Sequence, residues 1–280
     1  MPLFLLKESD MNTQRLKLVQ DMCPLVPERH RWLYASAWMK QIRSSDFVIQ
    51  NKFISWRRTF TKDGTQPLTP PTNSLITIDE WAPSVWPSEH RGWIHFGIQH
   101  HEAIVFLDEP RVWSSQARRH LAACRKNNIT FRLGTFSEFA DNISNSQVPH
   151  HLQKVFINEV RRHIHSHPET VDFLIAQQGD EIVSCFVAGN IDEIKQSYYL
   201  AGFFKRGTEK LHAKVGLIDW WFTRSLEKRY TTLNFGHIVG ARPITGIDTG
   251  VGYSNFKTHF GVKRIWWPGS FWKFHIKWLT

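Results

Sequence analysis

The order of segments in the second half of the chain constrains the fold more than any other feature of the sequence. Residues 171–204 predict three antiparallel strands, because apolar, β-branched and aromatic stretches are interrupted by turn residues at 179–180 and 190–193. A basic loop, a long amphipathic helix, a strand, a short helix and closing strands are expected to follow at 205–210, 212–230, 231–238, 252–261 and 262–279. The long helix places Val215, Ile218, Phe222 and Leu226 on one face. Strands and helices in this order predict an α/β protein with an α+β mixed sheet.

The first half of the chain is less regular. The expected elements are a helix at 32–43, strands within 47–60, a strand pair at 93–110, a basic helix at 114–128, a strand at 129–134 and two helices within 136–167. Ser114 or Ser115 can cap the basic helix, and Asn127 with Asn128 can end it. Residues 1–30 resemble a loosely helical lead-in. Residues 62–90 hold five of the 13 prolines and are expected to be the longest irregular segment.

Composition narrows the class of protein. Hydrophobic residues make up 41% and charged residues 21%, a balance typical of globular chains and not of disordered ones. Cys23, Cys124 and Cys185 lie far apart and form no CxxC pair, which argues against a disulfide framework and predicts a cytoplasmic location. No stretch approaches the roughly 18 apolar residues of a membrane span. The apolar run at 1–10 is too short for the core of a signal peptide.

The chain also carries a surplus of positive charge. Lys and Arg number 35 against 25 Asp and Glu, which gives a net charge of +10. Such a surplus favours a polyanionic partner, namely nucleic acid, a phosphorylated substrate or an anionic lipid. The alternative is that the charge is spread evenly and only aids solubility. The 13 Trp residues suit wet clefts as well as cores and do not decide between these uses.

Several motifs, taken in order, resemble those of the FemABX-like branch of the GNAT acyltransferase superfamily. They are YYLAGF at 198–203, the helix at 212–230, LNFGHI at 233–238 and, above all, NFKTHFG at 255–261, which resembles an F-K-x-x-F-G motif. Upstream, VWSSQARRHLAACRKNNITFRLGTFSEFADNI at 112–143 resembles that family's basic helix and the helix start that follows it. The resemblance covers residues 112–265.

The resemblance implies a GNAT fold in two tandem lobes. Residues 1–145 would form an N-terminal GNAT-like lobe that contains the proline-rich loop 62–90, and residues 146–280 a C-terminal lobe that carries the active-site core. The implied activity is acyl transfer, in which an aminoacyl group passes from aminoacyl-tRNA to an amine, for example on a peptidoglycan precursor. The expected partners are therefore tRNA and a small-molecule or lipid-linked amine, with no tightly bound cofactor.

Two other functions stay open at this point. An acyl-CoA-dependent N-acetyltransferase of the same fold would act on a sugar or amino-acid amine. A catalytically inactive module would only bind RNA. The second alternative is conceivable because the family's strand-end aspartate is replaced by Asn234 and its second glycine by His237.

Acyl transfer needs a neutral amine nucleophile, a strand that holds the donor and a charge that stabilises the tetrahedral oxyanion. Lys257 matches the family lysine in NFKTHFG, so its ammonium is expected to contact the oxyanion. The alternative is a surface lysine on a short helix. Tyr253 is expected to relay a proton. Tyr198 and Tyr199 are expected to line the substrate cleft, or else to be half-buried packing residues.

A basic loop is the candidate site for the phosphates of the donor. It contains Lys205, Arg206, Gly207 and Lys210 and leads into the helix at 212, whose free N–H groups and dipole favour an anion. The coenzyme A signature Q/R-x-x-G-x-G/A is missing, because Glu209 follows Arg206 at the place of the first signature glycine. The alternative is a basic, solvated turn.

A second basic group lies on the helix at 114–128. Spacings of seven residues place Arg118 with Arg125 and Arg119 with Lys126 on one broad face. This face suits a phosphate-rich partner such as a nucleic acid. The alternative is again a solvated surface.

Other sites are not expected. His163, His165 and His167 alternate but lack cysteine partners, so we expect no metal. The run GVGYSN, which begins at Gly250, lacks the third glycine of a dinucleotide loop, and there is no GxSxG nucleophile elbow. The aromatic, basic tail at 264–278 is expected either to touch a membrane interface or to form buried strands.

Overall fold

The computed structural model describes residues 40–43, 46–61, 65–68, 72–83, 87–95, 100–166, 168–238, 251–267 and 271–277. These residues fall into two units. The first takes its residues from 1–101 and 265–280, and the second consists of 102–264. The expected lead-in at 1–30 and most of the expected helix at 32–43 lie outside the described residues.

The first unit is built on a mixed sheet. Its strands are β1 (Lys40–Arg43), β2 (Asp46–Gln50), β3 (Ile54–Thr61), β4 (Ile76–Pro83), β5 (Ile94–His95) and β13 (Phe271–Ile276). They form one six-stranded sheet in the order β1-β2-β3-β4-β13-β5. β3 and β4 run parallel, whereas the other pairs are antiparallel.

Two expectations for this region are wrong. Lys40–Arg43 belongs to a strand that pairs with β2, although a helix was expected at 32–43. β4 lies within 62–90, which was expected to be irregular. Its sequence ITIDEWAP alternates, and Thr77, Asp79 and Trp81 are buried on one face. The strand ends at Pro83, so no proline interrupts its hydrogen bonds to β3 and β13.

The second unit is built on a larger mixed sheet. The strands of this sheet, whose residues lie mostly within 102–264, are β6 (His100–Phe106), β7 (Thr130–Leu133), β8 (Val171–Gln178), β9 (Glu181–Ile191), β10 (Gln196–Phe204), β11 (Thr232–Ile238) and β12 (Lys263–Trp267). The seven strands follow the order β12-β6-β11-β10-β9-β8-β7. β7 to β10 are antiparallel, whereas β10 and β11 run parallel.

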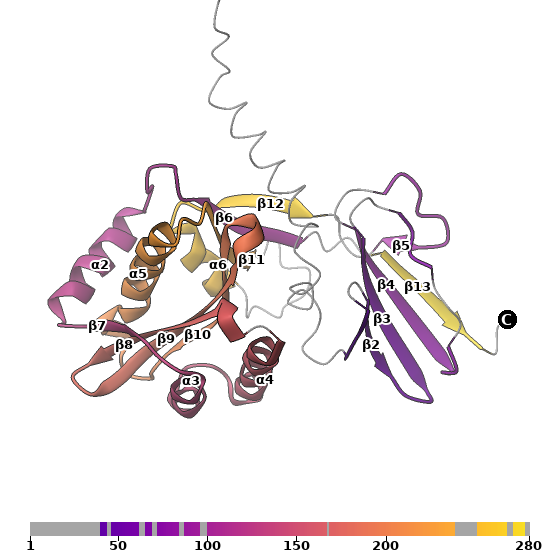
Figure 1. The fold of residues 1–280 in the computed structure, drawn as a ribbon, viewed down its shortest axis with the longest axis horizontal. Helices are drawn as coiled ribbons and strands as arrows, with labels where there is room; N and C mark the ends of the chain where they lie inside the picture. Colours follow the sequence, from indigo (N-terminus) through magenta and orange to yellow (C-terminus); the bar gives the residue numbers. More distant parts are fainter. Residues whose placement is uncertain are drawn as a thin grey trace, which may run out of the picture. The chain divides into compact units, whose positions relative to one another are not determined.

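Helices lie on both faces of this sheet. They are α2 (Ser115–Lys126), α3 (Phe136–Asn142), α4 (His150–Ser166), α5 (Ala213–Glu227) and α6 (Val251–Thr258), with 3₁₀ turns η3 (Ile143–Asn145), η4 (Pro168–Thr170), η5 (Asp192–Ile194) and η6 (Glu209–Leu211). Figure 1 shows α2, α5 and α6 on one face and α3 and α4 on the other. No described helix is long and apolar enough to cross a membrane.

Successive strand residues supply two separate hydrophobic cores. Leu174 and Phe186 pack with the α5 residues Trp221 and Phe222 in one core. Phe173, the neighbour of Leu174, packs with residues of α3 and α4 in the other core. This arrangement explains why β8 and β9 are nearly continuously apolar, since both of their faces are buried.

The local predictions for this unit are largely confirmed. The three strands expected at 171–204 are β8, β9 and β10. Ser114 caps α2 by accepting a hydrogen bond from the N–H of Ala117 at 3.1 Å, and Asn127 ends the helix. On α5 the expected apolar face is buried except for Leu226, which is 43% exposed.

The division into units differs from the expected boundary at 145/146. The helix α2 and the strand β7 were expected in an N-terminal lobe but belong to the second unit, since β7 pairs with β8 and Arg125 on α2 contacts Asp219 on α5. Conversely, β13 lies in the first unit, because it pairs with β4. The structure is α+β with two mixed sheets. That the first unit is itself a GNAT-like lobe stays a prediction.

The close approach of α5 to its neighbours generates a prediction. A Cβ atom on Gly216 would lie 2.5 Å from the Phe131 ring and 2.7 Å from the Cys124 sulfur. We expect Gly216→Ala to lower the free energy of unfolding by about 1–3 kcal/mol, because the added methyl group overpacks this contact. Thr223→Ala, at an exposed position of the same helix, is the control and should have little effect. A Gly216→Ala protein as stable as the wild type in urea unfolding would contradict this account of the packing.

Candidate active site

The strands β10 and β11 pair over only part of their length. Their parallel register joins Gln196 to Thr232, Ser197 to Leu233 and Tyr198 to Asn234, and no later pair is formed. β10 nevertheless continues to Phe204 and β11 to Ile238. Within the described residues, the pairing of the two strands therefore ends at Tyr198 and Asn234, and the place where it ends is called here the opening between β10 and β11. An extended group that enters such an opening can bind to strand backbone.

The end of β11 is shaped by one glycine. Gly236 has a φ of +71°, a conformation that favours glycine, and its N–H donates a hydrogen bond to Oδ1 of Asn234 at 2.7 Å. The Asn234 amide in turn donates to Oε2 of Glu102 at 2.8 Å. Asn234 and Glu102 are both buried. A carboxylate on β6 is thus held beside the position at which the family aspartate was expected.

Lys257, the expected catalytic lysine, lies on α6 and is only 1% exposed. This excludes the alternative of a surface lysine. Burial lowers the pKa of Lys257 to about 7, because the charged form loses its hydration. The Glu102 carboxylate opposes this shift of the pKa, and the charge of Lys214 adds to it.

Lys214 is the second amine of the site. It is the second residue of α5, and its Nζ lies 4.6 Å from the centroid of the Phe256 ring and 6.0 Å from that of Tyr199. Burial lowers the pKa of Lys214 to about 8. The site thus combines two amines that change protonation near neutral pH with one buried carboxylate. Such a cluster can take a proton from a ligand and can hold a positive charge beside it.

Of the two tyrosines expected in the cleft, the structure brings only one to this cluster. Tyr199 packs with the core beneath α5, 4.8 Å from the Phe186 ring. Tyr198 is buried, and its hydroxyl lies 3.1 Å from Nε2 of His163 on α4. Adjacent strand residues point to opposite faces, so Tyr198 is a packing residue on the far side of the sheet.

The basic loop expected to bind donor phosphates contacts its own surroundings. Lys205 pairs with Glu181, and the Arg206 guanidinium donates to the backbone carbonyl of Ser146 at 2.8 Å. The N–H of Gly207 donates to the Glu209 carboxylate at 3.2 Å. Lys210 is exposed and follows Glu209 in the turn η6. Phosphate binding here stays a prediction, and it requires the phosphate to replace Glu209 at the Gly207 N–H.

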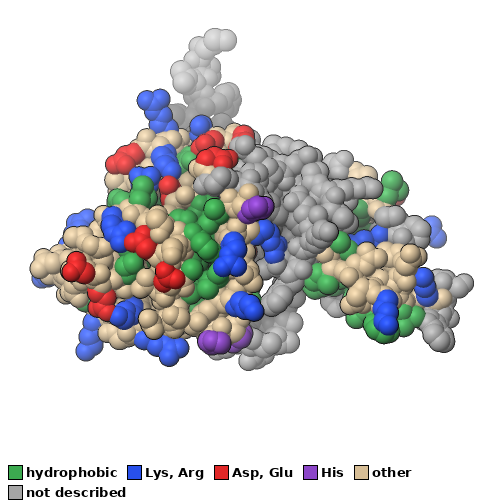
Figure 2. Space-filling view, turned by 60° about the horizontal axis from the view of Figure 1, so that its bottom comes forward, with side chains coloured by type: hydrophobic (Ala, Val, Ile, Leu, Met, Phe, Trp, Pro, Cys, Tyr) green, Lys and Arg blue, Asp and Glu red, His purple; other side chains and the backbone are tan. Residues whose placement is uncertain are grey.

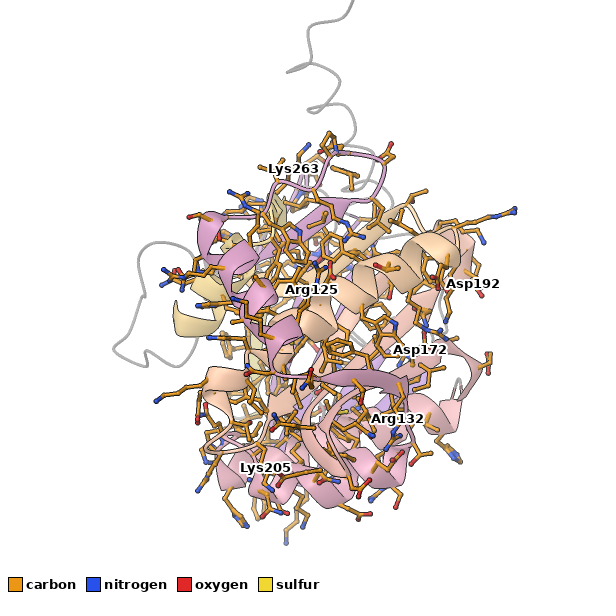
Figure 3. The ribbon with its side chains drawn as sticks, turned by 90° about the vertical axis from the view of Figure 1, so that its left-hand side faces the viewer. Arg125, Arg132, Asp172, Asp192, Lys205 and Lys263 are labelled. Atoms are coloured by element: carbon orange, nitrogen blue, oxygen red, sulfur yellow. The ribbon has the colours of Figure 1, made fainter. Side chains whose placement is uncertain are left out.

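The basic residues of α2 differ in their contacts. Arg118 donates to the backbone carbonyl of Trp113, and Arg125 contacts Asp219 at 3.4 Å. Arg119 and Lys126 are exposed. Figure 3 shows Arg125 well apart from Lys205, so α2 and the basic loop do not place these two cations together. Nucleic-acid binding by α2 stays a prediction.

The structure describes only part of what was expected for Tyr253, His237 and the histidines that follow one another at 163–167. Tyr253 lies in the first turn of α6 and His237 in β11, but their side chains are outside the described residues. Within the part of the chain that is described, no group of three metal-ligating side chains was found. His163 is buried against Thr170, with 3.0 Å between Nε2 and the hydroxyl, and His167 is outside the described residues.

Sequence reasoning missed Glu102 and Lys214. Glu102 is a single carboxylate in the run HHEAIVF, and the four residues after it, 103–106, are apolar and buried. Lys214 follows the first residue of a largely apolar helix. A lone charge within an apolar run is the signal that could have identified both residues.

Comparison with known proteins gives a fold but no family. No protein-family model and no curated protein matches the sequence. Among solved structures, the chain is similar to FemX, with a TM-score of 0.56 at 10% identity over 74% of each chain. It is also similar to the C-terminal domain of a "Putative Lysylphosphatidylglycerol Synthetase" from Agrobacterium fabrum, with a TM-score of 0.54 at 15% identity over 93% of this chain and 92% of that one.

A third similar structure is L-PGS from Bacillus licheniformis, with a TM-score of 0.51 at 10% identity over 82% of this chain and 80% of that one. At these identities the similarity concerns the fold alone. The fold is GNAT-like, as the motifs predict.

The buried lysine predicts an unusual pH dependence of stability. The pKa of Lys257 is about 7 in the folded protein but ordinary in the unfolded chain, so the unfolded chain binds more protons between these values. Wild-type stability should therefore rise with pH above about 7. Lys257→Met should remove this contribution, so the stability of the variant relative to that of the wild type should be greatest at pH 6 and should fall as the pH rises above about 7.

Urea unfolding at pH values from 6 to 10 measures this difference, which should shrink as the pH rises. Lys154→Met, at an exposed lysine of α4, is the matched control. A Lys257→Met protein whose stability rises with pH above 7 as steeply as that of the wild type would contradict this account of the pKa of Lys257.

Proposed function

We propose that this protein is an acyltransferase whose reaction takes place at the opening between β10 and β11. The observation that carries the proposal is the cluster of Lys257, Lys214 and Glu102, in which two lysines have pKa values of about 7 and about 8. An amine acceptor is protonated at neutral pH and must lose a proton before it can attack. A base with a pKa near the working pH performs this step best.

In the proposed reaction, Lys257 in its neutral form takes a proton from the ammonium group of the acceptor. The acceptor nitrogen then attacks the acyl carbon, and the protonated Lys257 stabilises the oxyanion that forms. When the tetrahedral intermediate collapses, the bond to the donor oxygen breaks, Lys257 returns a proton to that oxygen, and the attacking nitrogen releases its remaining extra proton to water, which leaves a neutral amide. This sequence unites a base role with the oxyanion contact that the motif predicts for Lys257.

Lys214 and Glu102 act on Lys257 in opposite directions. The charge of Lys214 lowers the pKa of Lys257, and the carboxylate raises it. The hydrogen bond from Asn234 holds Glu102 in place. Both are therefore positioning residues in this proposal, and Asn234 needs no charge of its own to contribute. The replacement of the family aspartate is thus compatible with activity.

The proposed donor is aminoacyl-tRNA, and the proposed acceptor is an amine of a peptidoglycan precursor at the cytoplasmic face of a membrane. The net charge of +10 supports a nucleic-acid donor. The name of one similar protein, a lysylphosphatidylglycerol synthetase, combines an aminoacyl group with a lipid. Figure 2 shows Lys and Arg side chains on the second unit with Asp and Glu between them. The proposed contacts of the tRNA are the exposed cations Arg119 and Lys126 of α2.

The central test is the pH profile of acyl transfer to an amine, with aminoacyl-tRNA and acetyl-CoA compared as donors. The rate should rise through pH 7, because the neutral form of Lys257 is needed. Lys257→Met should lower kcat/KM by about 10²–10³. Lys214→Met should move the rise to higher pH, since it removes a positive neighbour of Lys257.

The control for both variants is Lys154→Met, which should keep the wild-type profile. Near-normal turnover by Lys257→Met would refute the catalytic assignment. Transfer from acetyl-CoA but not from aminoacyl-tRNA would leave the catalytic assignment intact and would show that the donor is an acyl-CoA. Binding of tRNA without transfer to any amine would favour the inactive RNA-binding module.

A second prediction concerns tRNA binding by α2. Each lost phosphate contact flattens the dependence of log K on log salt by about 0.7–0.9. If Arg119 and Lys126 contact phosphates, changing both to Ala should reduce the slope by about 1.5 and leave the fold intact, because exposed charges add little stability. The double change Lys154→Ala with Arg161→Ala on α4 removes the same charge elsewhere and is the control. If both double variants show the same slope of log K against log salt, the basic face of α2 is a solvated surface and does not contact tRNA.

A further inference from the structure

The first unit presents an open apolar face that the proposed acyl transfer does not use. Three adjacent strands place side chains in register on that face. The rows are Ile54, Ile76 and Ile276; Trp56, Ile78 and Phe274; and Arg58, Glu80 and Trp272, taken from β3, β4 and β13 in turn. Alternation places the remaining residues of these strands on the other face, where Trp81 and Phe271 are fully buried.

Large apolar side chains on this face remain in contact with water. Ile54 is 42% exposed, Phe274 46% and Ile276 39%, and Phe53, just before β3, is 57% exposed. Scattered exposed side chains are ordinary, but these are neighbours across one end of a sheet. β3 and β4 are interior strands with a partner on each side, and β13 pairs with β4 along its whole length, so most backbone groups of these strands are paired. Such a face can enter an apolar medium with few unpaired backbone groups.

The charges around this end of the sheet have one sign. Lys52 and Lys277 both lie at this end, because the backbone of each is hydrogen-bonded to Leu75: the carbonyl of Lys52 accepts from the N–H of Leu75, and the N–H of Lys277 donates to the carbonyl of Leu75. Both lysines are exposed. The acidic residues of β4 are buried and paired, Glu80 with Arg58 at 2.9 Å and Asp79 with Arg57 at 2.6 Å. Figure 2 shows hydrophobic and basic side chains both exposed on this unit.

The aromatic rings of the face are held firmly. Trp56 donates its indole N–H to Glu80 at 3.1 Å and lies 5.7 Å from the Trp272 ring, which stacks on Phe274 at 6.3 Å. The tail at 264–278 is therefore buried only in part. Phe271 is buried in the core, while Trp272, Phe274 and Ile276 belong to the open face.

We propose that this face of the first unit binds the surface of an anionic membrane. Indole and phenyl rings favour the boundary between headgroups and acyl chains, isoleucines favour the acyl chains, and lysines at the rim favour anionic headgroups. RNA is a poorer partner, because isoleucine side chains offer no ring on which a base can stack. The inference rests on the first unit alone and not on the proposed acyl transfer.

The test uses the full chain and sedimentation with vesicles made of equal parts phosphatidylglycerol and phosphatidylcholine, or of phosphatidylcholine alone. The wild type should bind the anionic vesicles more tightly, and salt should weaken this preference. Ile54→Thr with Phe274→Thr should weaken binding to anionic vesicles by about tenfold or more, because two apolar side chains are lost. Threonine keeps the β-branched shape that suits a strand.

The matched control is Leu133→Thr with Leu226→Thr in the second unit, at residues that are 46% and 43% exposed. It should bind vesicles like the wild type. Phe53→Ser, at a residue outside the strands, repeats the test where the sheet cannot be disturbed. Thermal melting verifies that every variant is folded.

Three results would overturn the proposal. The first is a wild type that does not bind anionic vesicles. The second is a face variant that binds them as well as the wild type but has lost binding to uncharged tRNA. The third is a wild type whose mass by light scattering is that of a dimer, with the face variants monomeric, since a second copy would then cover the face.

Discussion

The burial of the seven-stranded sheet on both of its faces is the constraint from which most of the second unit follows. Phe173 and Leu174, neighbours on β8, pack into different cores, one beneath α3 and α4 and the other beneath α5. A sheet covered in this way excludes water from its centre. Polar groups placed there must find partners or change protonation state. Glu102, Asn234 and Lys257 are such groups, and all three lie where the pairing of β10 and β11 ends.

The candidate active site depends on a balance between opposing effects on one amine. Burial and the charge of Lys214 favour the neutral form of Lys257, whereas the Glu102 carboxylate favours its charged form. The result is a pKa of about 7, at which a lysine can both accept and return a proton. The hydrogen bond from Asn234 to Glu102 links this balance to the strand that borders the opening. In the proposed function, Lys257, Lys214 and Glu102 supply the chemistry at this place in the sheet.

The first unit uses strand alternation differently. One face of its sheet is closed around Trp81, Trp93 and Phe271, whereas the other leaves Phe274 and its neighbours partly exposed. The tail contributes to both faces because successive residues of β13 point in opposite directions. The two proposals, acyl transfer in the second unit and membrane binding by the first, together predict chemistry on a substrate held at a membrane.

Features that depend on neighbouring residues could be predicted from the sequence: the Ser114 cap, the turn at Gly179, the three strands β8 to β10 and the motif around Lys257. Caps, turns and periodicity involve groups only a few positions apart. The tertiary structure alone decided that β13 joins β4, that Lys257 is buried and that Tyr199, not Tyr198, faces the site. It alone joined Asn234 to Glu102, across 132 residues. Long-range pairing is chosen by the packing of whole faces, which no local pattern encodes, and the pKa of a lysine follows from what that packing places around it.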